Sequence, residues 1–165
     1  MSKLQTTYHR SPIGLTKIIG NEHGIQSISL LDADDSVVQE TPPKELADCL
    51  HKAKKQLREY FAGNRTEFDL KLAPQGTAFQ QKVWSALLRI PFSTTTTYAA
   101  QSTNLGNIKA IRAVAAANGK NPIAIVIPCH RVIGSDGSLT GYAGGLWRKK
   151  WLLAHENPFK QQSLF

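Results

Sequence analysis

The chain has 165 residues, of which 41% are hydrophobic, and this is enough to bury the core of one domain or of two small ones. No apolar run approaches the ~20 residues that a membrane-spanning helix needs, and the N-terminus lacks the apolar core of a signal peptide. We therefore expect a cytoplasmic protein, or a nuclear one if the organism has a nucleus, without a membrane partner. Neither of the two cysteines, Cys49 and Cys129, has a second cysteine at metal-ligand spacing, which argues against a zinc site.

The net charge of +8 belongs entirely to the second half of the chain. Residues 1–76 hold ten Lys and Arg and ten Asp and Glu, whereas residues 77–165 hold ten Lys and Arg against two acidic residues, Asp136 and Glu156. A charge that served solubility alone would be spread over both halves. The asymmetry therefore indicates that the second half binds a polyanion, and we favour a nucleic acid.

The first half has the pattern of a small α+β unit. Residues 4–31 alternate apolar and polar side chains between Gly and Pro, which predicts an antiparallel sheet. A helix is predicted over 44–61, and Cys49 flanks its apolar face, where we expect a packing role. That face consists of Leu46, Leu50, Ala53, Leu57 and Phe61. Residues 68–72 alternate again and predict a final strand.

A boundary between two domains is predicted at 73–76, a stretch that contains Pro and Gly. Thr77 and Gln80 then match a capping box at the start of a helix, which Pro91 ends. The apolar face of this helix consists of Phe79, Val83, Leu87 and Ile90.

Two further helices, joined by a Gly-containing turn, are predicted over 98–103 and 108–118, which is the pattern of a helix-turn-helix. In the second helix we expect one face to pack inward, and it carries Ile108, Ile111 and Ala115. A neighbouring face has small side chains flanked by basic ones, and it comprises Lys109, Ala110, Arg112, Ala113 and Ala117. Such a face packs against another helix in most proteins. In a basic half with a helix-turn-helix, we favour a surface that faces a nucleic-acid groove.

The apolar run 123–127 predicts a short buried strand, which Pro128 ends. Cys129 follows this element, with His130 next to it. A thiol reacts as its thiolate, and a nearby imidazole or a positive charge such as Arg131 lowers the pKa of the thiol. The alternative is a small buried hydrophobe, the commoner role of a lone cysteine, and neighbours on a strand also point to opposite faces. The rest of the second half leads us to place the chemistry here.

A Gly-rich loop over 134–145 precedes a final helix over 146–156. This helix carries Trp147, Trp151 and Ala154 on one face. Glu156 falls at its C-terminal end, where the helix dipole disfavours a carboxylate. We therefore expect a His or Arg side chain to hold Glu156.

These residues resemble the O6-alkylguanine-DNA alkyltransferases, also called methylated-DNA–protein-cysteine methyltransferases. The motifs that carry the resemblance lie within 77–157, and they are Asn121-Pro122, Pro128-Cys129-His130-Arg131-Val132, Gly141-Tyr142-Ala143-Gly144-Gly145-Leu146 and Trp151-Leu152-Leu153-Ala154-His155-Glu156. The run Gly-Tyr-Ala-Gly-Gly looks like that of bacterial members. Some members carry a structural zinc in the first half, and the cysteines that would bind it are missing here.

The resemblance implies direct and irreversible transfer of the alkyl group from guanine O6 to Cys129, with one turnover per protein and no cofactor. By the same resemblance, His130 takes the thiol proton through a water, Glu156 orients His130, and Asn121 braces the active-site turn. It also implies a set of substrate-binding residues: Tyr98, which donates to the purine ring, Val132, whose carbonyl reads the exocyclic amine, Ser135, near O6, and Tyr142, which lines the pocket.

The partner that the resemblance implies is double-stranded DNA with an O6-alkylguanine, or an O4-alkylthymine, contacted in the minor groove by a monomer. A stacked base cannot reach a buried thiol, so the nucleotide must be flipped out of the duplex. Arg112 matches the arginine that fills the space left by the base. Lys109, Ala110 and Ala113 would contact the minor groove beside it.

The fold that we expect is α+β, with a small antiparallel sheet and one helix followed by a mainly helical unit with a (winged) helix-turn-helix. The expected domains are an N-terminal support domain (1–73), a DNA-binding and alkyl-acceptor domain (77–157) and a disordered tail (158–165).

Three other functions compete with alkyl transfer. A lesion-binding relative that flips the base without accepting the alkyl group would lack the cysteine, and Cys129 is present. A regulator triggered by alkylation would need a further domain, for which 165 residues leave little room. A cysteine hydrolase would need an oxyanion hole and would leave the basic half unexplained.

Overall fold

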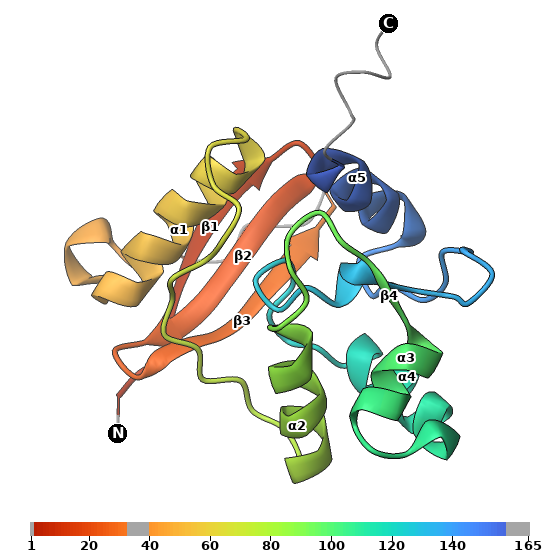
Figure 1. Cartoon of the computed structure of the whole chain (residues 1–165). Coiled ribbons are helices and arrows are strands. Elements are labelled where there is room, and N and C mark those ends of the chain that lie inside the picture. Colours follow the sequence, from red (N-terminus) through yellow and green to blue (C-terminus); the bar gives the residue numbers. More distant parts are fainter. Residues whose placement is uncertain (1, 33–39, 158–165) are drawn as a thin grey trace, which may run out of the picture. The chain divides into compact units, whose positions relative to one another are not determined.

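The computed structural model describes residues 2–32 and 40–157, which form two compact units (Figure 1). The first unit comprises the chain up to Gln75 together with Pro122–Ala124, and the second comprises Gly76–Asn121 and the chain from Ile125 onward. The predicted tail over 158–165 lies outside the described residues.

Three antiparallel strands form the sheet of the first unit, so the prediction from alternation is confirmed. They are β1 (Gln5–Ser11), β2 (Gly14–Asn21) and β3 (Gly24–Leu31), in that order across the sheet. Each of the two connecting turns ends at a glycine with positive φ, Gly14 at 114° and Gly24 at 136°. Glycine adopts this conformation without steric cost, so the local sequence sets the strand register.

Helix α1 (Asp48–Phe61) packs on β1 and β2. It begins later than the predicted residue 44, because the chain first forms a 3-10 turn, η1 (Pro43–Glu45), and then an extended residue, Leu46, at ψ 133°. The buried side chains of α1 are Cys49, Leu50, Ala53, Gln56, Leu57 and Tyr60. The Cys49 thiol donates a hydrogen bond to the Asn21 carbonyl at 2.8 Å, as suits a packing role.

The predicted strand over 68–72 is wrong. Only an isolated bridge joins Leu72 to Ile25 of β3. The backbone of Asp69 is bound instead by a side chain of α1, because the Gln56 amide donates to the Asp69 carbonyl at 3.0 Å and accepts from its N–H at 2.9 Å. These bonds use the groups that a strand ladder would need.

The second unit is mainly helical. Its elements are α2 (Ala78–Leu87), β4 (Thr96–Thr97), α3 (Tyr98–Asn104), the 3-10 turn η2 (Ile108–Ala110), α4 (Ile111–Gly119), the 3-10 turn η3 (Cys129–Arg131), β5 (Val132–Ile133) and α5 (Leu146–Glu156). Strands β4 and β5 form a short parallel pair that the sequence did not predict. None of the helices within the described ranges is both long and apolar enough to cross a membrane.

Helix α2 has the predicted capping box, with the Thr77 hydroxyl accepting from the Gln80 N–H and the Gln80 side chain accepting from the Thr77 N–H. Its buried side chains are Val83, Trp84 and Leu87, whereas Phe79, expected on the inner face, is 41% exposed. The Trp84 ring lies so close to Gly76 that a Cβ there would be 2.4 Å from it, so this position before the helix requires glycine.

The inward face predicted for the second helix of the helix-turn-helix is wrong. Ile108 and Ile111 are 51% and 37% exposed, and the buried residues of α4 are Val114, Ala117 and Asn118. Ile108 lies in η2, whose tighter turn breaks the helical spacing that the prediction assumed. Gln101 of α3 and Asn118 join the two helices by a buried pair of amide hydrogen bonds at 2.9 and 2.8 Å.

The apolar run 123–127 is not a strand. Beyond one bridge at Ile123, the chain turns, and Ile125 has φ of 72° in the left-handed region. Burial explains the apolar composition, because Ile123, Ile125, Val126 and Ile127 are all buried. A short apolar run indicates burial and does not by itself distinguish a strand from a buried turn.

Candidate active site around Cys129

Cys129 is the first residue of the turn η3 and directly follows Pro128, and it is only partly exposed. The sharp turn is closed by a hydrogen bond from the Cys129 N–H to the Ile127 carbonyl at 2.8 Å. Burial raises the pKa of the Cys129 thiol, while a hydrogen bond with the Asn121 side chain and the positive charge of Lys149 act in the opposite direction. The thiol is thus held in a poorly solvated place with two groups that favour its thiolate.

Asn121 braces this turn from the start of the loop that joins α4 to η3. Its side-chain amide donates to the Ile127 carbonyl at 2.7 Å, and the same side chain contacts the Cys129 thiol. One side chain therefore fixes the backbone before the thiol and also favours the thiolate.

Glu156 is held by both kinds of partner that we expected. His130 Nε2 lies 2.8 Å from Glu156 Oε2, and Arg131 donates from Nε to Oε1 at 2.7 Å and from Nη2 to Oε2 at 3.1 Å. His130 and Glu156 are 0% and 2% exposed. A bidentate arginine fixes the plane of the carboxylate, so that one of its oxygens faces the imidazole. Arg131, expected to help Cys129, faces Glu156 instead.

The shifts of pKa in this cluster follow from burial and charge. Burial lowers the pKa of His130, and Arg131 and Lys149 act in the same direction against the opposing effect of Glu156. Burial alone would raise the pKa of the Glu156 carboxyl, but the hydrogen bonds and charges of His130 and Arg131 outweigh it and hold that pKa far below its usual range. The pair is thus a neutral imidazole beside a carboxylate, as a general base requires. His130 Nδ1 is buried without a hydrogen-bond partner among the described residues.

Lys149 is a residue that the sequence analysis missed. It is 0% exposed on α5, and no carboxylate within the described ranges forms an ion pair with it. Its Nζ donates to the Thr140 carbonyl at 2.8 Å and lies 3.4 Å from the Tyr98 hydroxyl, which donates to the same carbonyl at 3.1 Å. The spacing of Lys149 from Glu156, seven residues along one helix, was a signal that could have placed both on one face.

The structure brings three of the four expected substrate-binding residues near this centre. Tyr98 contacts Lys149, Val132 is fully buried at the start of β5, and Tyr142 has a buried hydroxyl without a partner among the described residues. Burial raises the pKa of Tyr142 well above its usual value, and the nearby Cys129 adds to the effect. Ser135 is different, because it is exposed in the turn over 134–138 and its side chain has no hydrogen bond with any described residue.

The four expected DNA-contact residues lie together on η2 and the start of α4. Lys109, Arg112 and Ala113 are exposed, and Ala110 is half-buried. Ile108 and Ile111 are exposed on the same segment. Exposed apolar side chains interleaved with basic ones are typical of a surface that a partner covers.

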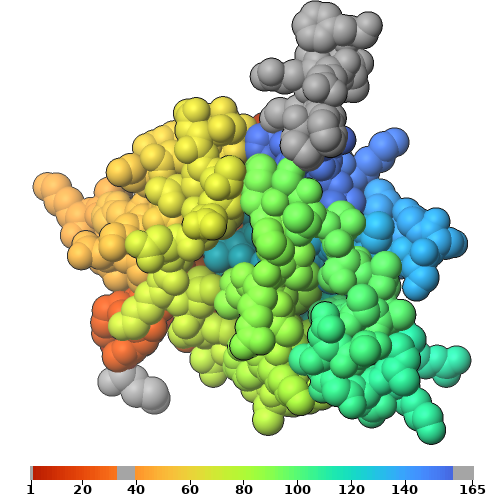
Figure 2. Space-filling view, viewed as in Figure 1, coloured from red at the N-terminus to blue at the C-terminus, as the bar shows by residue number. Residues whose placement is uncertain are grey.

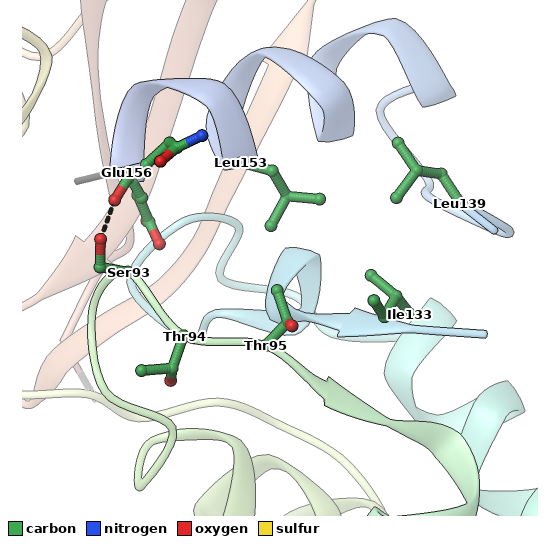
Figure 3. A pocket seen from close by; sticks show the side chains of 8 residues that line it. Ser93, Thr94, Thr95, Ile133, Leu139, Leu153 and Glu156 are labelled. Atoms are coloured by element: carbon green, nitrogen blue, oxygen red, sulfur yellow. Dashed lines mark hydrogen bonds between the residues drawn. The ribbon is translucent and has the colours of Figure 1, made fainter. Parts of the chain in front are cut away.

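A cavity of about 260 Å³ adjoins Glu156 on the side of the 93–95 segment (Figure 3). Its lining residues are Ser93, Thr94, Thr95, Ile133, Leu139, Leu153, Glu156 and Asn157. In this view Ser93 points at the end of α5, where its hydroxyl donates to the Glu156 backbone carbonyl. Among the described residues, no group of three or more His, Cys, Asp or Glu side chains could hold a metal ion.

A braced thiol, a neutral imidazole and an oriented carboxylate are the arrangement expected of the class of proteins with a nucleophilic cysteine, and the same unit has a helix-turn-helix. Two family models match the chain: the ribonuclease-like domain of 6-O-methylguanine DNA methyltransferase over 4–74, and the DNA binding domain of 6-O-methylguanine DNA methyltransferase over 78–158. The chain therefore belongs to the 6-O-methylguanine DNA methyltransferase family.

Individual relatives agree over nearly the whole length. The methylated-DNA–protein-cysteine methyltransferase of Methanosarcina acetivorans is 47% identical over 146 residues, which cover 88% of this chain and 94% of the relative. That of Mycolicibacterium paratuberculosis is 45% identical over 154 residues, 93% of each chain. The crystal structure of Mycobacterium tuberculosis O6-methylguanine methyltransferase superposes with a TM-score of 0.80 at 38% identity, covering 99% of this chain and 100% of that one. The structure of Mycobacterium tuberculosis OGT in complex with DNA gives 0.80 at 41% identity, with 98% and 99% covered.

Proposed function

We propose that this protein repairs DNA by transferring the alkyl group of an O6-alkylguanine in duplex DNA to the sulfur of its own Cys129. The observation that carries this assignment is the thiol of Cys129, which contacts the Asn121 side chain, feels the charge of Lys149 and adjoins the His130–Glu156 pair in the chain. Family membership supplies the substrate class, since the relatives are named methylated-DNA–protein-cysteine methyltransferases.

In the proposed step, His130 takes the proton of the thiol through a water, and the sulfur attacks the alkyl carbon. The carbon–O6 bond breaks, its electron pair returns to the guanine, and a proton restores the neutral base. The hydroxyl of Tyr98 stabilises the charge that develops on the purine. The product is a thioether at Cys129, and because its carbon–sulfur bond does not hydrolyse, each protein acts once.

The target base must leave the helix to reach this thiol, which supports base flipping. Arg112 would fill the space that the base leaves, and Lys109, Ala110 and Ala113 would contact the minor groove. We propose that residues 77–157 bind the DNA and accept the alkyl group, and that residues 1–73 form a supporting domain. We also propose that the protein acts as a monomer in the cytoplasm.

Intact mass spectrometry after incubation with a duplex containing O6-methylguanine, followed by peptide mapping, tests this function. We expect a gain of one methyl group on Cys129, restored guanine in the DNA, and no second modification when fresh DNA is added. Cys129→Ser should remain unmodified, and Cys49→Ser should react as the wild type does. Binding without any gain in mass would identify a lesion-binding protein instead.

A further inference from the structure

The turn between α2 and β4 contains an unusual backbone conformation at Ser93. Its φ is 72°, in the left-handed region that L-amino acids other than Asn and Asp rarely adopt. Ser93 is the third residue of a turn closed by Thr94, whose N–H and hydroxyl both donate to the Pro91 carbonyl, at 3.2 and 2.8 Å. A positive φ at this position of a turn favours glycine. Within this turn, the conformation that serine disfavours thus falls on the residue that contacts α5.

This conformation directs the Ser93 hydroxyl at the backbone carbonyl of Glu156 (Figure 3). Glu156 is the last residue of α5, where a carbonyl has no partner within the helix. Ser93 thus supplies a hydrogen bond that the helix cannot supply, at the residue whose side chain orients His130.

The same turn also holds the side chain of Glu156, through Arg131. Arg131 Nη1 donates to the Ile90 carbonyl at 2.6 Å while its other two nitrogens bind the Glu156 carboxylate. Its guanidinium lies 5.8 Å from the centre of the Phe92 ring. The segment 90–94 therefore fixes Glu156 twice, at the main chain through Ser93 and at the carboxylate through Arg131.

We propose that Ser93 is a positioning residue for the transfer reaction: it fixes the end of α5 so that the Glu156 carboxylate meets His130 Nε2 and Arg131 at the same time. This inference rests on the proposed function only in its kinetic consequence. The alternative is that Ser93 serves stability alone, as any cap of a helix end does.

Two substitutions of Ser93 distinguish a positioning role from a role in stability alone. Ser93→Gly removes the hydroxyl and relieves the backbone, because glycine adopts positive φ without steric cost. Ser93→Ala removes the hydroxyl and keeps the unfavourable backbone. Thr94→Ala is the matched control, since among the described residues its hydroxyl bonds only to the Pro91 carbonyl of the same turn.

The experiment measures the single-turnover transfer rate from an O6-methylguanine duplex as a function of pH, together with Tm. A positioning role predicts that Ser93→Gly and Ser93→Ala both slow transfer by about 2- to 10-fold, the range that one hydrogen bond supplies, and shift the pH profile. Ser93→Gly should do so with a Tm at or above that of the wild type, and Thr94→Ala should stay within about twofold in rate. A wild-type rate and pH profile for Ser93→Gly would overturn the proposal, as would rates that simply follow Tm.

A second readout does not depend on alkyl transfer. The Nε2–H resonance of His130 in proton NMR reports on its hydrogen bond with Glu156 in the free protein. We expect this resonance to move or broaden in Ser93→Gly and to stay unchanged in Thr94→Ala. If the wild-type protein transferred no methyl group, the proposed function would fail, and this resonance would still decide the role of Ser93, because an unchanged resonance in Ser93→Gly refutes it.

Discussion

At the scale of single residues, the site combines two buried positive charges with different environments. Arg131 has its carboxylate, Glu156, at 2.7 Å, whereas Lys149 has only neutral oxygen acceptors, at Thr140 and Tyr98, among its hydrogen-bond partners in the described ranges. A buried cation without a counter-ion favours any nearby group that can become an anion. Cys129 is such a group, and Lys149 lowers the pKa of its thiol.

Replacing Lys149 by Met should therefore raise the pKa of the Cys129 thiol further and move the alkaline limb of the rate profile to higher pH. Each unit of that movement slows the reaction about tenfold at a fixed pH below the pKa. The measurement is the pH dependence of Cys129 alkylation, by iodoacetamide and by O6-methylguanine DNA. Lys150→Met, at an exposed position on the same helix, is the control. Superimposable profiles for the two variants would exclude the electrostatic role.

Glu156→Gln should destabilise the protein strongly, because it leaves the Arg131 guanidinium buried without its counter-charge. We expect a loss of about 3–5 kcal/mol in the free energy of unfolding. The matched surface change is Glu59→Gln, which breaks the partly exposed pair with Arg65 and should cost at most about 1 kcal/mol. Urea unfolding measures both, and equal losses would contradict the assignment of a buried ion pair.

At the scale of elements, the sequence predicted what local chemistry decides. The antiparallel sheet within 4–31, the capping box at Thr77 and the bounds of the last helix, 146–156, all appear in the structure as predicted. The predictions that failed concern segments whose conformation depends on neighbours distant in sequence. The run 123–127 was misread because burial in a turn and burial in a strand select the same apolar residues, and the strand 68–72 failed because Gln56 binds its backbone.

The same distinction between local signals and distant contacts explains which residues of the site could be predicted from the sequence. Cys129, His130 and Asn121 are carried by a motif, and the position of Glu156 at a helix end predicted a basic partner, which is confirmed. Ser93 left no such signal, because its role comes from a φ value and from a contact with a helix far along the chain.

The exposed face of η2 and α4 leads to a prediction at this scale. Arg112→Ala should slow repair of O6-methylguanine in a duplex, because the proposed flipped state loses the side chain that would replace the base. The reaction with free O6-benzylguanine should stay within about twofold, because a free base needs no flipping. The salt dependence of duplex binding should weaken by about one phosphate contact if Arg112 also neutralises the backbone. Lys120→Ala, exposed beyond the end of α4, is the control. A parallel loss with the free base would place Arg112 in the chemistry instead.

At the scale of the whole molecule, the buried pair couples the active site to stability. The pKa values of His130 and Glu156 are both lowered in the folded protein, so the unfolded chain binds protons that the folded one does not. Stability therefore falls as the pH falls, from about pH 6.5 because of His130 and from about pH 4.3 because of Glu156. His9, whose pKa is lowered mainly by burial, adds an effect of the same sign.

The free energy of unfolding by urea, measured between pH 7.5 and pH 4, checks this coupling. We expect a decline that begins near pH 6.5 and steepens below about pH 4.5. His130→Gln should be less stable at neutral pH and should show a flatter dependence between about pH 6.5 and pH 5. An equal slope in that interval for the variant and the wild type would show that His130 does not titrate as its burial requires.

The two hydrogen bonds that the Thr140 carbonyl accepts bear on which bases the protein would select. In the free protein it accepts from Tyr98 and from Lys149 together, so the tyrosine proton is already bonded before any base arrives. A purine that takes this proton exchanges one acceptor for another, while Lys149 keeps the carbonyl satisfied. A base with no acceptor at that position leaves the tyrosine proton on the Thr140 carbonyl and gains no hydrogen bond from it. Under the proposed role of Tyr98, a base with a suitably placed acceptor therefore gains one hydrogen bond that other bases lack.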